Sequence, residues 1–295
     1  MLGVKLVLTA GIVVSASVVV ERSGPLLGAL VVTLPVTVWP AYVFLSLDHN
    51  ADYIAASAQS GLAVNAASAV FMLIYLVMAQ TRGLVISLIV AISCWIGVAW
   101  LLLSVTWTVV GAGLLNLLVY PVCLWLSRSF REVEVQRVAR QWYELPLRTA
   151  LVCALMGTVL GLSHWAGPST TGMLAVYPIS TTCTMLILHT RIGGRASAAV
   201  IANGLWGLFG IGGGLFALSI AILPLGIAIA LALALFIPVA WNLSVWFFRH
   251  RRSRVHVSSS PISLCIPAGS NGHMAQQLHD LNEKDRPDVE SIRKR

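Results

Sequence analysis

The chain contains very little charge. Only 10% of its 295 residues are Asp, Glu, Lys or Arg, whereas 58% are hydrophobic, and the mean hydropathy is +0.85. Soluble domains carry about 25% charged residues, so this composition excludes an ordinary soluble domain. It indicates an integral membrane protein, in which apolar runs of about 20 residues cross the bilayer as helices.

The sequence also lacks the motifs of common catalytic sites. It has no zinc signature, nucleophile elbow or phosphate-binding loop, and its five cysteines show no paired spacing. Four of these cysteines lie in apolar runs, where free cysteine behaves as a small buried hydrophobe: Cys94, Cys123, Cys153 and Cys183. We therefore predict no metal, cofactor or catalytic residue, and a membrane-embedded enzyme ranks third among the functional hypotheses.

What the sequence does contain is one stretch written twice. The matching positions are each displaced by 143 residues (178 − 35 = 143): Gly24 and Gly167, Pro25 and Pro168, Pro35 and Pro178, Leu45 and Leu188, Gly61 and Gly204. An internal repeat of this length predicts a tandem duplication, and many secondary transporters are built from a duplicated helix bundle.

Nine apolar spans fit the chain. They lie near residues 4–20, 26–47, 54–79, 84–103, 105–126, 147–162, 170–189, 196–217 and 221–248. Residues 15–17 also resemble a signal-peptidase site. We favour a retained first helix, because residues 147–161 occupy the matching place before the second Gly-Pro.

The distribution of Lys and Arg predicts the orientation. With an external N-terminus, the internal connections hold Arg22, Arg82, five arginines of residues 128–148, Arg191, Arg195 and four arginines of residues 249–254. The external connections hold none, and Lys5 is the exception on the N-terminus. Because positive residues are retained in the cytoplasm, we predict an N-out, C-in chain.

These patterns predict an all-α bundle of two inverted repeats. Repeat 1 covers residues 1–104, a linker helix residues 105–127, a cytoplasmic interfacial segment residues 128–146, and repeat 2 residues 147–248. Each repeat has about four helices. If the repeats begin at spans one and six, an odd number of crossings, five, separates them, so the two repeats have opposite orientations in the membrane. A basic cytoplasmic tail, residues 249–295, is predicted to be disordered.

The interfacial segment and the tail are the candidate working surfaces for partners. Residues 129–143 mix arginines with Val133, Val138 and Trp142, a spacing that suits either an amphipathic helix at the membrane surface or a solvated loop. The basic cluster of residues 249–252 is expected to contact anionic lipid at the cytoplasmic face. We predict no nucleic-acid partner, and homo-oligomerisation is left open.

One short motif resembles a known family. Gly172 stands six residues before Pro178, and Gly-Leu-Trp ends in Trp206 after a basic loop. This arrangement resembles the small four-helix bacterial inner-membrane proteins of the GlpM type over about residues 148–248, and more faintly over residues 4–103. The resemblance implies two four-helix units fused through the fifth helix. The family has no established activity to transfer, so it assigns no functional residue.

Polar residues within the spans are the candidate substrate path, because polar groups in hydrocarbon need a partner or a cavity. Prolines at 35 and 178 are predicted to break their helices. The path residues near these breaks and on the following helices are Thr37, Ser60, Ser180, Thr182 and Asn203. Ser60 and Asn203 are repeat equivalents (203 − 60 = 143). The alternative role for Thr37, Ser180 and Thr182 is to satisfy the backbone groups that the prolines free. For Ser60 and Asn203 it is hydrogen bonding between helices.

Two further features leave alternatives open. The glycines of residues 207–214 indicate either close helix packing or a flexible gate. Asp48 and Asp52 flank an external connection, where a carboxylate serves either in a solvated loop or in proton coupling.

The leading hypothesis is a secondary carrier for a small polar solute in a bacterial inner membrane. The runner-up is a membrane scaffold or accessory subunit that does not transport.

Overall fold

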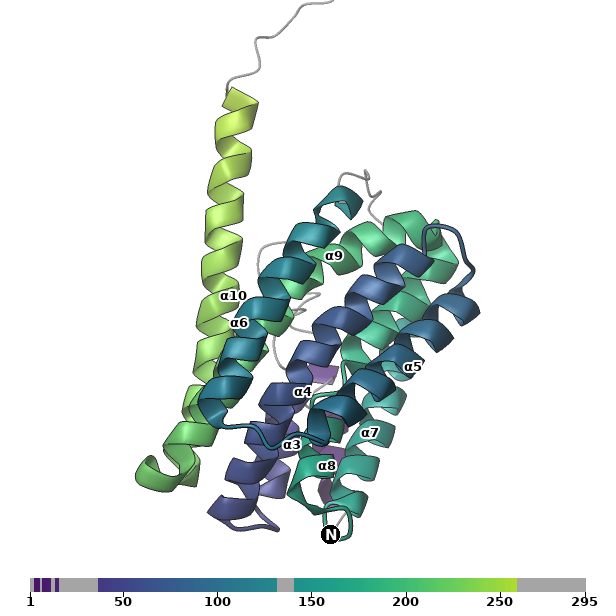
Figure 1. The fold of residues 1–295 in the computed structure, drawn as a ribbon. Coiled ribbons are helices and arrows are strands. Elements are labelled where there is room, and N and C mark those ends of the chain that lie inside the picture. Colours follow the sequence, from purple (N-terminus) through teal and green to yellow (C-terminus); the bar gives the residue numbers. More distant parts are fainter. Residues whose placement is uncertain (1–2, 6, 12–13, 16–36, 132–140, 259–295) are drawn as a thin grey trace, which may run out of the picture. The chain divides into compact units, whose positions relative to one another are not determined.

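The computed structural model describes residues 3–5, 7–11, 14–15, 37–131 and 141–258, with side chains described up to Phe248. Every regular element within these ranges is helical, in the order α3 (Val38–Leu45), α4 (Ala51–Met78), α5 (Leu84–Leu103), α6 (Val109–Leu126), a 3₁₀ turn η1 (Ser127–Phe130), α7 (Glu144–Leu162), α8 (Gly167–Ala175), α9 (Ile179–Leu225) and α10 (Ile227–Ser258) (Figure 1). The all-α prediction is thereby confirmed for the described part of the chain.

Six stretches of the described residues are long and apolar enough to cross a membrane. They comprise α4, α5, α6 with η1, α7, the 59-residue stretch Gly167–Leu225, and α10 up to Phe248. The chain is therefore a multi-pass membrane protein by length and composition. About half of the first two predicted spans lies outside the described residues, so the count of nine stays a prediction.

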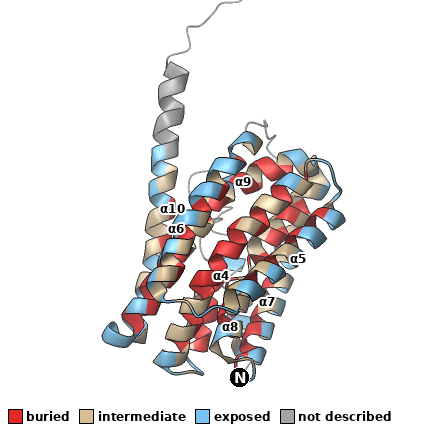
Figure 2. Cartoon of the chain, in the orientation of Figure 1, coloured by how far each residue is buried: buried red, intermediate tan, exposed pale blue. Residues whose placement is uncertain are grey.

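The helix at the centre of the described bundle is α4. Asn50 caps its N-terminus by accepting a hydrogen bond from the backbone N–H of Tyr53. Asp52 occupies the first turn, where a negative charge interacts favourably with the helix dipole. Ala, Gly and Ser are frequent along α4, so neighbouring helices can approach closely. Its apolar window is 72% buried, and it packs against α5, α6, α8 and α9. Figure 2 shows this helix as largely buried.

The stretch Gly167–Leu225 is interrupted twice. Residues 176–178, ending in Pro178, separate α8 from α9, in agreement with the helix break predicted there. Within α9, Gly193 has φ 81° and ψ 167°, a conformation open to glycine but not to most residues. The α9 helix therefore consists of two arms, residues 179–192 and residues 194–225. Gly226, with φ 81°, makes a similar turn into α10.

The second arm of α9 runs antiparallel to α4. The Tyr75 hydroxyl at the end of α4 hydrogen bonds to Ser197 near the start of the arm, whereas Asn65, further back on α4, reaches Leu208. A third contact fits the same register, because Gly194 packs against the carbonyl of Ala79. Residue numbers thus rise along one helix as they fall along the other.

Three outer helices present apolar faces outward. Only 28% of the apolar window of α5, and 22% of those of α6 and α10, is buried, and the window of α7 is also 22% buried. Trp100, Leu118 and Phe236 are among the exposed side chains. Exposed apolar faces of this extent suit contact with lipid acyl chains and would be unstable in water.

Two predicted segments fall largely outside the described part. The proposed amphipathic helix of residues 129–143 includes residues 132–140, which are not described. After residue 140 the chain is described again: Trp142 is 84% exposed, and α7 begins at Glu144. Helix α10 continues past Phe248 to Ser258, and residues 259–295 of the predicted disordered tail are not described.

The packing of α8 on α4 generates a stability prediction. A Cβ atom added to Gly172 would lie 2.0 Å from the carbonyl oxygen of Ser57, which is backbone and cannot rotate away. We expect Gly172→Ala to lower the free energy of unfolding by about 1–3 kcal/mol or more, the usual cost of overpacking. The measurement is thermal unfolding of the purified protein.

Gly97→Ala is the matched control. Gly97 lies within α5 and a Cβ there would meet nothing within 4 Å, so alanine should be neutral or stabilise by up to about 1 kcal/mol through its helix propensity. Equal unfolding temperatures for the two variants would contradict this account of the α4–α8 contact.

Candidate functional site

Two buried asparagines meet at the centre of the bundle. Asn65 of α4 is 1% exposed and Asn116 of α6 is 4% exposed. The Asn65 Nδ2 donates to Asn116 Oδ1 at 3.0 Å and to the carbonyl of Leu208 at 3.4 Å. The Tyr120 hydroxyl adds a bond to the Asn65 carbonyl at 3.1 Å. The cluster therefore links α4, α6 and α9 through polar groups in an otherwise apolar interior.

The amide of Asn116 is almost fully used. Its Nδ2 donates to the carbonyl of Leu62 at 2.7 Å and to that of Ala112 at 2.8 Å, which occupies both N–H groups. Its Oδ1 accepts the bond from Asn65, and a side-chain carbonyl has two lone pairs. One acceptor position on Asn116 is thus available to a further donor.

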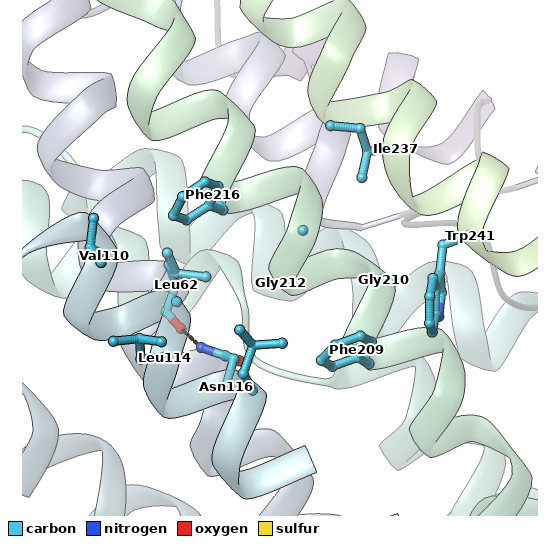
Figure 3. Close-up of a pocket in the computed structure, with 13 residues that line it drawn as sticks. Leu62, Val110, Leu114, Asn116, Phe209, Gly210, Gly212, Phe216, Ile237 and Trp241 are labelled. Carbon is cyan, nitrogen blue, oxygen red and sulfur yellow. Dashed lines mark hydrogen bonds between the residues drawn. The ribbon is translucent and has the colours of Figure 1, made fainter. Parts of the chain in front are cut away.

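Asn116 also lines a cavity of about 310 Å³ between α4, α6, α9 and α10. Figure 3 shows Phe209, Phe216 and Trp241 around it, with Asn116 bonded to Leu62 at one side. The other lining residues are Val110, Gly113, Leu114, Leu117, Gly210, Gly212, Gly213 and Ile237. Its size falls at the lower end of small-molecule sites, and Asn116 is its one polar side chain.

Glycines of α9 bring α10 close to this cavity. A Cβ on Gly210 would lie 2.7 Å from the Trp241 ring, and one on Gly214 would lie 2.6 Å from the carbonyl of Ala234. These glycines stand four residues apart on one helix face, the small-xxx-small pattern of close membrane helix pairs. Of the two alternatives for residues 207–214, the contacts favour close packing.

The helix break at Pro178 lies in a different place. Tyr177 packs edge-on against Trp95 of α5, with ring centroids 4.9 Å apart, and its hydroxyl accepts a bond from Thr182 at 3.3 Å. The Thr182 hydroxyl also lies 3.1 Å from the Pro178 carbonyl. The break is therefore satisfied by neighbouring protein groups, as a broken membrane helix requires. Pro35 lies outside the described residues.

None of the predicted path residues lines the cavity at Asn116. Thr37 is buried just before α3, and Ser180 is partly buried in the first turn of α9. Ser60 donates to the Ala56 carbonyl within its own helix. Asn203 is exposed and donates to Ala199, also within its helix. Their role in a solute path stays a prediction.

One end of α4 carries a cluster of ionisable groups. Lys5 forms an ion pair with Asp48, and His49 stacks on Tyr53 with ring centroids 3.9 Å apart. The His164 ring lies 5.0 Å from that of His49. Asp52, the other predicted coupling residue, is exposed in the first turn of α4.

Hydrogen bonds at this end join the α3–α4 connection to the α7–α8 connection. His49 Nε2 lies 3.0 Å from the Ser163 hydroxyl, and the Tyr53 hydroxyl donates to the Ser163 carbonyl at 2.6 Å. The same hydroxyl lies 2.8 Å from Thr171 Oγ1. These contacts connect residues more than 100 positions apart in the sequence.

The other end of α4 has an analogous set. The Tyr75 hydroxyl lies 3.0 Å from His189 Nδ1 and 2.9 Å from the Ser197 hydroxyl, so it bridges both arms of α9. Arg191 forms an ion pair with Glu144 at the start of α7. Each end of α4 therefore carries one tyrosine hydroxyl that reaches across to the second half of the chain.

Sequence reasoning missed Asn116 and the meeting of His49 with His164. Asn116 had a usable signal, since it is a lone amide in the apolar run of residues 109–126, and intramembrane polar groups mark candidate sites. The histidine pair had no signal, because 115 positions separate its members (164 − 49 = 115) and neither belongs to a motif.

The comparisons with known proteins add no identification. No family model matches the chain, and no curated protein or solved structure matches it either. The resemblance to GlpM-type proteins stays a prediction.

The environment of His49 predicts a pH dependence. Burial lowers the pKa of its imidazole below the usual 6.5, nearby His164 and Lys5 lower it further, and Asp48 opposes them. Above pH 6.5 the imidazole is neutral in both the folded and the unfolded chain. Below it, the unfolded chain takes up the proton more readily, so His49 makes stability fall from about pH 6.5 down to its folded pKa.

Thermal unfolding at pH 7.5 and pH 5.5 measures this effect. The loss of stability on acidification should be smaller in His49→Gln, whose amide does not titrate and can still bond to Ser163. In His164→Gln the loss of stability on acidification should be reduced only in part, because burial still lowers the pKa of His49. An unchanged loss in His49→Gln would show that other groups control the acid response.

Proposed function

We propose that the protein is a secondary carrier for a small solute, in which two inverted repeats alternate access to the cavity at Asn116. The observation that carries the proposal is the hydrogen bond between Asn65 and the carbonyl of Leu208. These residues are 143 positions apart (208 − 65 = 143), which is the displacement of the sequence repeat. A residue that meets its own repeat equivalent lies beside the axis that relates the two repeats.

The helix boundaries support the same displacement. Helix α4 begins at Ala51 and the second arm of α9 at residue 194, after the non-helical Gly193; 194 − 51 = 143. Helices α5 and α10 begin at Leu84 and Ile227, and 227 − 84 = 143. A duplicated unit would produce this agreement of two successive helix starts.

The antiparallel course of these equivalents supports inversion. Helix α4 and the second arm of α9 run in opposite directions about their contact at Asn65, which requires an axis across the helices and so within the membrane plane. This is the symmetry of carriers that alternate between inward and outward access by moving one repeat against the other. Helix α6, the proposed linker, packs on both and contributes Asn116.

We place this carrier in a bacterial inner membrane with its N-terminus outside and its C-terminus inside. The arginines of the sequence support this orientation through the positive-inside rule. The bilayer is then its principal partner, with anionic lipid at the basic cytoplasmic face. No chemical step is assigned, because carriage needs only a site and two accessible states.

The inverted arrangement predicts opposite accessibility for Arg82 and Leu225, which are repeat equivalents (225 − 82 = 143) and both exposed. Each would be changed to cysteine in a chain freed of its native cysteines, and intact cells labelled with a membrane-impermeant maleimide. Of these two cysteines, only the one at position 225 should react from outside. A cysteine that replaces the exposed Trp165 should also react from outside. Labelling of positions 82 and 225 from the same side would exclude inverted repeats.

Carriage itself is tested by metabolite profiling of cells that lack or overproduce the protein. Overproduction should shift the internal level of the solute in the opposite direction to deletion. We expect Asn116→Leu to abolish the shift, because it removes the polar group of the cavity. Thr158→Ala should preserve it, since this exposed hydroxyl of α7 bonds only to the Ala154 carbonyl of its own helix among the described contacts.

Truncation after Ser258 separates the carrier from an accessory subunit. The carrier should keep its effect on metabolite levels without residues 259–295, because the cavity and both ends of α4 remain. Loss of the effect on truncation, together with a fully active Asn116→Leu variant, would favour the accessory subunit and refute the proposed carrier.

A further inference from the structure

The composition of the cavity at Asn116 defines the class of molecule that it can hold. Twelve of its thirteen lining residues have apolar or no side chains. Even Trp241 offers only carbon surface, because its indole N–H donates to the Trp206 carbonyl at 2.8 Å. A strongly polar solute would lose its hydration here without gaining equivalent hydrogen bonds, which is unfavourable by several kcal/mol for each unmatched group.

The polar end of the cavity accepts one hydrogen bond. Both N–H groups of Asn116 are donated to backbone carbonyls, whereas its Oδ1 retains one lone pair. Gly212 keeps this oxygen uncovered, since an added Cβ would lie only 3.4 Å from it. A complementary ligand therefore has an apolar body and a neutral donor such as a hydroxyl.

The side of the cavity formed by α6 opens outward. Val110, Leu114 and Leu117 line the cavity and yet are 62%, 60% and 58% exposed. They lie on a helix that is long and apolar enough to cross the membrane. A ligand can thus reach the cavity from the hydrocarbon layer without passing through either end of the bundle.

We infer that the cavity binds a small amphipathic molecule, with an apolar body among Phe209, Phe216 and Trp241 and a hydroxyl donating to Asn116 Oδ1. The molecule enters laterally from the bilayer, between α6 and α10. A volume of about 310 Å³ suits about ten non-hydrogen atoms if each takes ~30 Å³, the share of a water molecule in the liquid. This inference specifies the solute class of the carrier proposed above. The binding site does not depend on that proposal, and only the transport of the bound molecule rests on it.

Photolabelling of the full-length protein in bilayers tests the inference. The probe is a medium-chain primary alcohol with a diazirine in mid-chain, and its methyl ether is the matched molecule without a donor. After irradiation, peptide mass spectrometry should locate the alcohol on residues 209–216 and on the segment around Trp241. The ether should label these positions about 3- to 30-fold less, the equivalent of one membrane hydrogen bond of about 0.6–2 kcal/mol.

Two variants of α6 control for non-specific lipid contact. Leu114 and Leu118 are both exposed, at 60% and 67%, but only Leu114 lines the cavity. Leu114→Trp should fill the mouth and remove the labelling, whereas Leu118→Trp should leave it intact. Both side chains are mostly exposed, so neither change perturbs the buried packing.

The outcomes distinguish this inference from the proposed function. Labelling that is equal for alcohol and ether, or unchanged in Leu114→Trp, overturns the inference and shows that the cavity merely holds lipid chains. Specific labelling supports the binding site even if metabolite levels do not respond to the protein. In that case the carrier proposal fails while the assignment of the ligand class stands.

Discussion

The crossing of α4 with the second arm of α9 is the contact on which the described bundle depends. In a bilayer, helices gain little from apolar contact alone, because lipid chains are as apolar as leucine. Close approach and hydrogen bonds must supply the association. Small residues of α4 allow the approach, Gly194 fits against the Ala79 carbonyl, and Asn65 bonds to both α6 and α9. Close backbone packing and inter-helix hydrogen bonding therefore occur at the same helix pair.

The polar residues of the bundle divide into two kinds. Ser60 and Thr182 bond to carbonyls four residues earlier in their own chain segment, which satisfies the side chain locally. Asn65 and Asn116 instead form bonds between helices, and Asn116 lines the cavity between α4, α6, α9 and α10. The cost of an unpaired amide in hydrocarbon then makes the inter-helix geometry specific.

This division explains how far the sequence could predict the structure. The span of α5, residues 84–103, and the break at Pro178 were both predictable, because apolar length and proline act locally. The choice among polar residues was not. Sequence cannot show whether a polar side chain bonds within its helix, as that of Ser60 does, or across to another, as that of Asn65 does. Most contacts at the centre of the bundle depend on that distinction.

The contacts at the two ends of α4 show where a movement between repeats would act. The ion pair of Lys5 with Asp48 joins residues of predicted repeat 1, and that of Arg191 with Glu144 joins predicted repeat 2 to the interfacial segment before it. Neither ion pair crosses between the two repeats. The hydrogen bonds between halves at these two ends are formed by His49, Tyr53 and Tyr75 and involve no ion pair.

These two tyrosines lie on either side of the crossing at Asn65. A rotation about that crossing moves residues near Asn65 least and the ends of α4 most. It would therefore strain the hydrogen bonds of both tyrosines more than those at the crossing. Neutral hydrogen bonds worth about 0.6–2 kcal/mol each suit such a movement, because they can break and re-form without separating buried charges.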